Sequence, residues 1–147
     1  MAVSLLENCQ LNRARLHAFV VMSHHLHLLV RPNDDQTISQ LMSKVKRQSA
    51  LTLGPKFNDF ERNQLNAQYG LNDHRFWKAG FRGFPIYTEE LRLQKLNYIH
   101  QNPVRADKVE EAQEYVWSSS HLYALGLFDE DLGLDLQKSI EYYQALL

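Results

Sequence analysis

The chain has 147 residues, of which 44% are hydrophobic and 22% charged, with a formal net charge of −1. This composition is typical of a soluble globular protein. The single cysteine, Cys9, excludes an internal disulfide framework and a zinc site built from clustered cysteines. Apolar runs are far shorter than the roughly 20 residues that a membrane span needs, and the sequence does not open with a secretion signal. We therefore expect a cytoplasmic protein with no membrane partner, divided into a domain at residues 1–123 and an acidic tail with a short helix at 124–147.

Charge is distributed unevenly along the chain. Residues 1–108 hold 15 of the 16 Lys and Arg and 9 of the 17 Asp and Glu, whereas residues 109–147 hold one basic and eight acidic residues. Such an asymmetry allows a basic working surface beside an acidic tail. Solvated surface charge with no partner would explain the same pattern.

The most informative stretch is residues 19–30, FVVMSHHLHLLV, which follows an amphipathic helix expected over 4–16. Its apolar, Val- and Leu-rich composition predicts a buried strand, which the turn formers of residues 31–35 would end. Because alternate side chains of a strand share a face, His25 and His27 would project together, with Leu26 behind them. Two neutral imidazoles side by side are half of a metal site, although histidines with ordinary hydrogen-bond partners remain the alternative.

A second helix is predicted from a Thr37 cap to about Leu53, where Gly54-Pro55 would stop it. Its apolar positions recur at helical spacing and leave a basic side. That side either lies along a phosphate backbone or is merely solvated. Its candidate DNA-contacting residues are Lys44, Lys46 and Arg47.

Residues 56–74 are polar and predict a connector, with at most a short helix or hairpin. Residues 75–87 interleave aromatic residues with Arg, Lys and Gly, which favours an irregular strand. The aromatic rings would either fill the core or stack on nucleic-acid bases, and we expect Trp77 to pack in the core.

A third helix is predicted over 88–101, with Thr88 as its cap. Pro103 disfavours helical geometry at the residue before it and so ends the helix. Tyr98 and Asn102 are four residues apart and would share one face at its C-terminal end. An anchor at 115–120, an acidic loop and a last helix from about Leu134 complete the expected elements.

Four segments, taken together, resemble single-tyrosine transposases with a His-hydrophobic-His (HUH) motif. His25-Leu26-His27, within residues 21–30, resembles that motif. Three further blocks resemble the REP-associated branch of the family, namely Phe76-Trp77, residues 98–106 and residues 115–119. The blocks occur in the family's order and cover roughly residues 10–123, the HUH-like domain.

The resemblance implies an α/β (α+β) fold of the ferredoxin-like kind, an antiparallel sheet with helices on one face. It implies a DNA-binding transposase that cuts and joins single-stranded or hairpin DNA through a 5′-phosphotyrosine intermediate. Tyr98 would be the catalytic nucleophile, and Mg²⁺ or Mn²⁺ would be held by His25, His27 and Asn102. Monomer and homodimer both remain open.

The sequence departs from this family at three places. Ser23-His24 stands where relatives usually have Pro-Asn, and Asp107 stands where they usually have Gly. Relatives also begin with a strand and a helix start before the point that Met1 matches. We therefore expect a sheet without its usual first strand, with a start upstream, a decayed copy, or another strand or subunit filling the gap.

Three other functions stay open at this point. A catalytically inactive transposase remnant would bind hairpin DNA without cutting it. An unrelated metal-dependent hydrolase could use the two histidines, but it would want further ligands, and Asp34 and Asp35 are the nearest carboxylates. In a plain α/β domain, Tyr98 would only fill the core. The transposase-type nuclease is the function that we expect.

Overall fold

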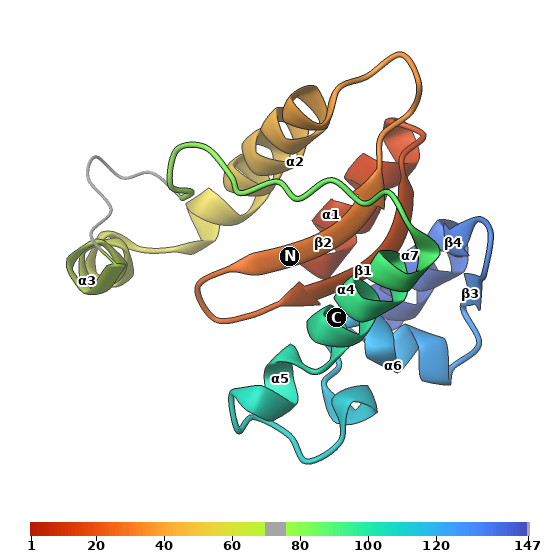
Figure 1. Cartoon of the computed structure of the whole chain (residues 1–147). Helices are drawn as coiled ribbons and strands as arrows, with labels where there is room; N and C mark the ends of the chain where they lie inside the picture. The colour runs from red at the N-terminus through yellow and green to blue at the C-terminus, as the bar shows by residue number, and fades with distance from the viewer. Residues whose placement is uncertain (70–75, 147) are drawn as a thin grey trace.

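A β-hairpin lies at the centre of the molecule, with helices packed around it (Figure 1). The computed structural model describes residues 1–69 and 76–146, and within them the chain forms seven α-helices and two two-stranded antiparallel sheets. The hairpin consists of β1 (Arg15–Val21) and β2 (Leu26–Arg31). The predicted α+β class is confirmed.

The other elements surround this hairpin. None of the helices in the described part of the chain is long and apolar enough to cross a membrane. Figure 1 shows α3 set off from the hairpin, beyond the end of α2. In chain order the elements are α1 (Ala2–Leu11), the hairpin, α2 (Ile38–Leu53), η1 (Gly54–Lys56), α3 (Asp59–Tyr69), α4 (Glu89–His100), α5 (Asn102–Arg105), η2 (Ala112–Glu114), α6 (Ser119–Ala124), β3 (Phe128–Asp129), β4 (Gly133–Leu134) and α7 (Leu136–Ala145).

The hairpin replaces the single strand predicted over residues 19–30. The backbone N–H of Met22 donates to the carbonyl of His25 at 2.9 Å, which closes a tight turn centred on Ser23-His24. The polar residues inside the apolar run therefore mark a turn and not the middle of a strand. The helix predicted over 4–16 is likewise shorter: it ends at Leu11, and Arg13, with φ +51, turns the chain into β1.

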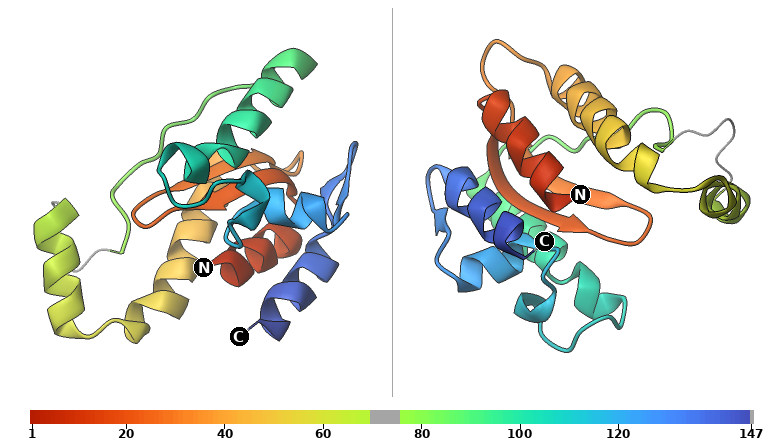
Figure 2. Two further views of the ribbon diagram at one scale, coloured as in Figure 1. Left: turned by 90° about the horizontal axis from the view of Figure 1, so that it is seen from below. Right: turned by 180° about the vertical axis from the view of Figure 1, so that it is seen from behind.

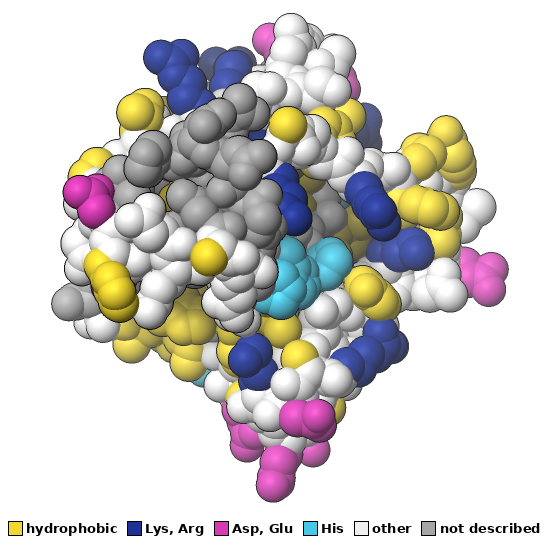
Figure 3. Space-filling view, turned by 90° about the vertical axis from the view of Figure 1, so that its left-hand side faces the viewer, with side chains coloured by type: hydrophobic (Ala, Val, Ile, Leu, Met, Phe, Trp, Pro, Cys, Tyr) yellow, Lys and Arg dark blue, Asp and Glu magenta, His cyan; other side chains and the backbone are white. Residues whose placement is uncertain are grey.

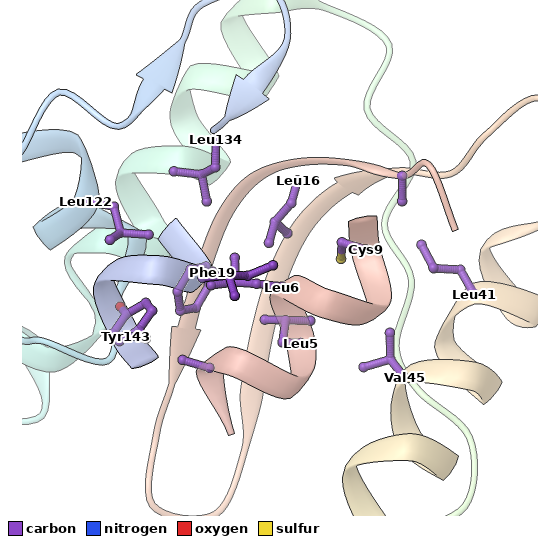
Figure 4. Packing of buried hydrophobic residues seen from close by; sticks show 13 residues of the cluster. Leu5, Leu6, Cys9, Leu16, Phe19, Leu41, Val45, Leu122, Leu134 and Tyr143 are labelled. Carbon is purple, nitrogen blue, oxygen red and sulfur yellow. The ribbon is translucent and has the colours of Figure 1, made fainter. Parts of the chain in front are cut away.

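One face of the hairpin packs on α1 and α7. Leu16 and Phe19 of β1 are at most 1% exposed, and the Phe19 ring centroid lies 6.5 Å from that of Tyr143 in α7. Leu5 and Leu6 of α1 fill the space between these elements (Figure 4). The view from behind in Figure 2 shows α1 and α7 side by side over this face. Residues 133–143 of the tail thus contribute to the main core.

The opposite face of the hairpin packs on α4. Ala18 and Val20 are fully buried and form a second core cluster with Leu29 and with Ile99 of α4. Helices therefore cover both faces, which corrects the expected arrangement with helices on one face. The physical reason is that residues 18–20 are consecutive apolar residues, so β1 needs apolar cover on both sides.

The outer edge of β1 is covered by residues 115–123 rather than by a full strand. The N–H of Val21 donates to the carbonyl of Trp117 at 2.9 Å. The Ser119 hydroxyl accepts from the N–H of Phe19 at 2.9 Å and lies 2.8 Å from Nε2 of His100. Burial lowers the pKa of His100 to about 4, so this imidazole is neutral at neutral pH. Side chains and a single bridge thus satisfy backbone groups that a neighbouring strand would otherwise pair.

The predicted ends of two helices are confirmed. The Thr37 hydroxyl accepts from the N–H of Gln40 at 3.2 Å at the start of α2. The Thr88 hydroxyl accepts from the N–H of Leu91 at 3.2 Å at the start of α4, which ends at a Gln101 cap. Both threonines satisfy backbone donors that a helix N-terminus leaves open.

The irregular strand predicted over 75–87 is wrong for residues 76–87, where the structure shows no strand; residue 75 lies outside the described part. Lys46 of α2 donates to the carbonyls of Lys78 and Gly80 and so occupies groups that a strand partner would bind. Trp77 is half-buried, and its Nε1 donates to the Ser49 hydroxyl at 2.9 Å. The expected connector at 56–74 contains α3, and its last residues, 70–74, lie outside the description.

Candidate active site

His25 and His27 lie together where the hairpin turn meets the C-terminal end of α4. Their ring centroids are 4.9 Å apart, and the His27 ring meets the ring of Tyr98 edge-on at 5.6 Å. His25 immediately precedes β2, and His27 is its second residue. The alternation of side chains places both imidazoles on the face that packs on α4. The spacing of the two histidines predicts that they share a face, as they do here.

Asn102 lies beside both Tyr98 and His25. It opens α5 directly after the Gln101 cap of α4, and its Nδ2 donates to the carbonyl of Tyr98 at 3.4 Å. A side-chain hydrogen bond with Asn102 raises the pKa of His25. Asn102 therefore lies close enough to His25 to influence the protonation of its ring. The structure therefore brings together all four residues predicted for catalysis and metal binding.

The electrostatics of the site favour neutral imidazoles. Burial lowers the pKa of His25, and the nearby His24 acts in the same direction, against the smaller effect of Asn102. Burial also lowers the pKa of His27, with a further contribution from His25. Only the neutral form of an imidazole can bind a metal ion. Both rings are thus in the form that a metal site requires.

Tyr98 is 43% exposed, which excludes the alternative in which it only fills the core. The guanidinium of Arg105 lies over its ring, 5.0 Å from the centroid, while His27 contacts it edge-on. A cation over an aromatic face is a favourable contact that restrains the ring. Sequence reasoning missed Arg105, because it lies in α5, beyond the end of α4, where helical spacing from Tyr98 gives no signal.

A large groove of about 2390 Å³ runs past these residues. Its walls come from the hairpin, α2, residues 76–86 and α4, and it includes His25 and Tyr98. Among the residues that the structure describes, the groove is lined by eight basic residues (Lys or Arg) and by three acidic residues (Asp or Glu). Figure 3 shows the histidines in a hollow of this face with Lys and Arg side chains around them, while the acidic side chains lie toward the margin. The groove is positively charged.

The three predicted DNA-contacting residues do not form one surface. Arg47 and Lys46 line the groove. Burial lowers the pKa of Lys46, whose ammonium group is also hydrogen-bonded to the carbonyls of residues 78 and 80. Lys44 instead donates to Oδ1 of Asn12 at 2.7 Å, beside a separate, smaller pocket. As DNA contacts all three stay predictions, with Arg47 the best placed.

The donor set at the hairpin turn fits a hard divalent cation bound together with a phosphate. It offers two neutral imidazoles and one amide oxygen, which leaves coordination positions for oxygen ligands from outside the protein. Within the described residues, no group of three or more His, Cys, Asp or Glu is placed to hold a metal ion. The Oδ1 atom of Asp34 lies 3.8 Å from Nη2 of Arg31, with which it forms an ion pair. The hydrolase alternative, which wanted additional carboxylate or histidine ligands, gains no support.

The departure at Asp107 has a clear structural consequence. Its φ is +50, the left-handed region that glycine adopts most easily and aspartate tolerates. The N–H of Asp107 donates to the carbonyl of Val104 at 3.0 Å and so ends α5. Aspartate can therefore make the turn for which relatives usually have glycine.

Comparison with known proteins identifies the class to which this fold and site belong. The family model "Transposase IS200 like" matches residues 2–102, which is more than half of the chain. The chain belongs to this family of IS200-like transposases. The resemblance found in the sequence is thereby confirmed at the level of the family.

The chain is also similar to a curated protein whose name is more specific than that of the family. The chain is 27% identical over 106 residues to a protein of Haemophilus influenzae named "Putative REP-associated tyrosine transposase". The match covers 71% of this chain and 57% of the relative, so the chain spans little more than half of the relative's length. No solved structure matches the chain.

Proposed function

We propose that the chain is a metal-dependent tyrosine nuclease and strand transferase that acts on single-stranded or hairpin DNA. The observation that carries this proposal is the convergence of His25, His27, Tyr98 and Asn102, because two of them, His25 and Tyr98, line a basic groove. Membership of the IS200-like transposase family supports the same class of reaction. Tyr98 is assigned as the nucleophile, and the other three residues are assigned as metal ligands.

The proposed step is a transfer of a phosphodiester bond to the protein. The Tyr98 hydroxyl loses its proton to solvent, and its oxygen attacks the scissile phosphorus. A bond forms between the phenolic oxygen and phosphorus, and the bond between phosphorus and the 3′ oxygen breaks. The 3′ oxygen takes up a proton, which leaves a free 3′ hydroxyl and a 5′-phosphotyrosine link. Because the covalent link conserves the phosphodiester, rejoining needs no nucleotide cofactor.

The side chains of the site have separate roles in this proposal. His25, His27 and Asn102 would hold Mg²⁺ or Mn²⁺, which would supply electrostatic stabilisation of the phosphate charge when bound. Arg105 holds the Tyr98 ring by its face, so the phenolic oxygen is oriented before DNA arrives. Arg47 and the other basic residues of the groove bind the phosphate backbone on either side.

The test is whether the substitution Tyr98→Phe abolishes formation of a covalent adduct with DNA. This change keeps the ring, its contact with His27 and its packing under Arg105, and it removes only the hydroxyl. The matched control is Tyr87→Phe, because Tyr87 is 84% exposed and is not among the described residues that line the groove. Each protein is incubated with Mn²⁺ and a labelled hairpin with a single-stranded flank, then denatured and examined for retained label.

We expect the unmodified chain and Tyr87→Phe to retain label and Tyr98→Phe to retain none, while all three bind the DNA equally. Label on Tyr98→Phe would overturn the assignment of the nucleophile. DNA binding without any adduct in the unmodified chain would overturn the nuclease proposal and favour the inactive, hairpin-binding remnant.

A further inference from the structure

Phe84 is an exposed aromatic residue inside the groove. Its side chain is 73% exposed, although it belongs to the wall that residues 76–86 form opposite the hairpin. It is not part of either core cluster of the described residues. A phenylalanine ring kept in water contributes little to the stability of the fold. Its position therefore points to a ligand rather than to packing.

A cation accompanies this ring. The Nζ atom of Lys95, in α4, lies 4.7 Å from the centroid of the Phe84 ring. Lys95 and Tyr98 are three residues apart on α4 and so share a side of the helix. Lys95, Phe84 and Tyr98 all line the same groove. An aromatic face and a cation thus line the same groove as the proposed nucleophile.

This combination matches the chemistry of unpaired nucleotides. Every base offers a π-face that can stack on an aromatic ring, and every nucleotide brings one phosphate for a cation. Bases inside a duplex already stack on each other, so a duplex has no free face to offer Phe84. The excess of Lys and Arg along the groove complements the phosphate backbone.

We propose that Phe84 and Lys95 form a subsite for one unpaired nucleotide of the DNA strand that Tyr98 cuts. The base stacks on the Phe84 ring, and Lys95 binds the neighbouring phosphate. The subsite rests on the proposed function, because it takes the strand in the groove to be single-stranded DNA. It makes selection of an unpaired segment a property of the groove itself.

The experiment compares two phenylalanines with two oligonucleotides. Phe84→Leu keeps an apolar side chain and removes the aromatic face. The matched control is Phe60→Leu on α3, because Phe60 is 70% exposed and is not among the described residues that line the groove. Binding of labelled oligo-dT is measured beside binding of an abasic oligonucleotide with the same backbone.

We expect Phe84→Leu to weaken oligo-dT binding about tenfold and to leave binding of the abasic strand unchanged. Phe60→Leu should bind both strands as the unmodified chain does. Lys95→Gln should weaken binding of both strands and reduce the salt dependence of binding by about one counterion. Equal losses on both strands for Phe84→Leu, or no loss on either, would overturn the stacking role.

The outcomes also separate this subsite from the proposed function. If Phe84→Leu binds oligo-dT like the unmodified chain while an adduct still forms in the Tyr98-dependent assay, the subsite fails and the nuclease stands. Phe84→Leu could instead lose affinity for oligo-dT alone while no protein forms an adduct. In that case the nucleotide subsite is supported and the nuclease proposal fails, so the chain would bind DNA without cutting it. If the unmodified chain binds neither strand, the subsite fails, and the hairpin adduct assay alone decides the nuclease proposal.

Discussion

The two faces of the central hairpin share one backbone but differ in role: one packs in the main core, and the other carries the candidate site at its turn end. On the face toward α1 and α7, Leu16 and Phe19 are buried in the main core and contact apolar side chains throughout. The face toward α4 begins in the same way, with Ala18 and Val20 packed on α4, but at the turn it presents His25 and His27 to Tyr98. One face stabilises the fold along its full length, and the other becomes polar within a few residues.

The comparison explains how the polar end can be well ordered. Its histidines lie beside and within β2, a strand held on both faces by apolar packing, and Tyr98 lies beside Ile99, which is 5% exposed. Rigid elements position reacting groups more accurately than loops do. We therefore expect changes at the polar end to affect chemistry far more than stability, and changes on the apolar face to do the opposite.

The largest expected effect is on cleavage by His27→Ala. Loss of one imidazole of the proposed metal site should remove several kcal/mol of transition-state stabilisation, which would lower the single-turnover rate at least about 1000-fold. The free energy of unfolding should change by only about 1 kcal/mol, since the side chain is half-buried. Cleavage in Mn²⁺ and urea unfolding measure the two quantities.

The control for that prediction is His121→Gln, because His121 lies in α6 and contacts Tyr142 rather than the site. It should leave the cleavage rate unchanged. A His27→Ala protein that cuts DNA at nearly the unmodified rate would contradict the division between the two faces.

The next effect is on stability, through Phe19→Ala on the apolar face. Truncating a fully buried phenylalanine removes about 3–5 kcal/mol from the free energy of unfolding, a large part of the total for a domain of this size. Phe19→Leu should lose much less and keeps the test informative if the alanine variant does not fold. Thermal unfolding measures the loss, and the folded fraction should still cut DNA. A selective loss of cleavage with unchanged stability would reverse the comparison.

A smaller effect is expected at Arg105, at the rim of the polar end. Arg105→Met removes the cation over the Tyr98 ring, a contact of about 1 kcal/mol, and should slow adduct formation about fivefold to tenfold. Arg105→Lys keeps a cation and should recover much of the rate. If methionine and lysine give the same rate, the charge over the ring plays no part.

The smallest effect lies outside both faces, at Asp107. Asp107→Gly relieves the left-handed backbone at φ +50 and should raise the free energy of unfolding by up to about 1 kcal/mol. The cleavage rate should stay the same. A decrease in stability on chemical denaturation would show that the aspartate side chain makes a contact that outweighs the strain.

Local signals in the sequence predicted helix ends well, and packing decided what they could not predict. Thr37 and Thr88 act within a few residues of themselves, so their caps could be found without the fold. The hairpin was missed because apolar residues continue on both sides of Ser23-His24, so residues 19–30 resemble one long strand although these polar residues form a turn. At residues 76–87, two backbone carbonyls are bound by Lys46, a residue so distant in sequence that local signals could not predict the contact.

At the candidate site, too, local spacing predicted some features and packing decided the others. The i, i+2 spacing of His25 and His27 and the i, i+4 spacing of Tyr98 and Asn102 each predicted which side chains share a side of their element. That the two pairs meet follows from the packing of α4 on the hairpin, which the family resemblance implied and the spacing did not. Phe84 could be placed in the groove only once its exposure was known.

The most direct measurement of the central claim is the position of the covalent bond. After reaction with Mn²⁺ and hairpin DNA and nuclease trimming of the bound strand, trypsin should release the peptide 96–105, in which Tyr98 is the sole tyrosine. We predict that mass spectrometry finds a nucleotide attached to this peptide and that the attachment is lost in Tyr98→Phe. A nucleotide on a peptide that carries any other tyrosine would contradict the account.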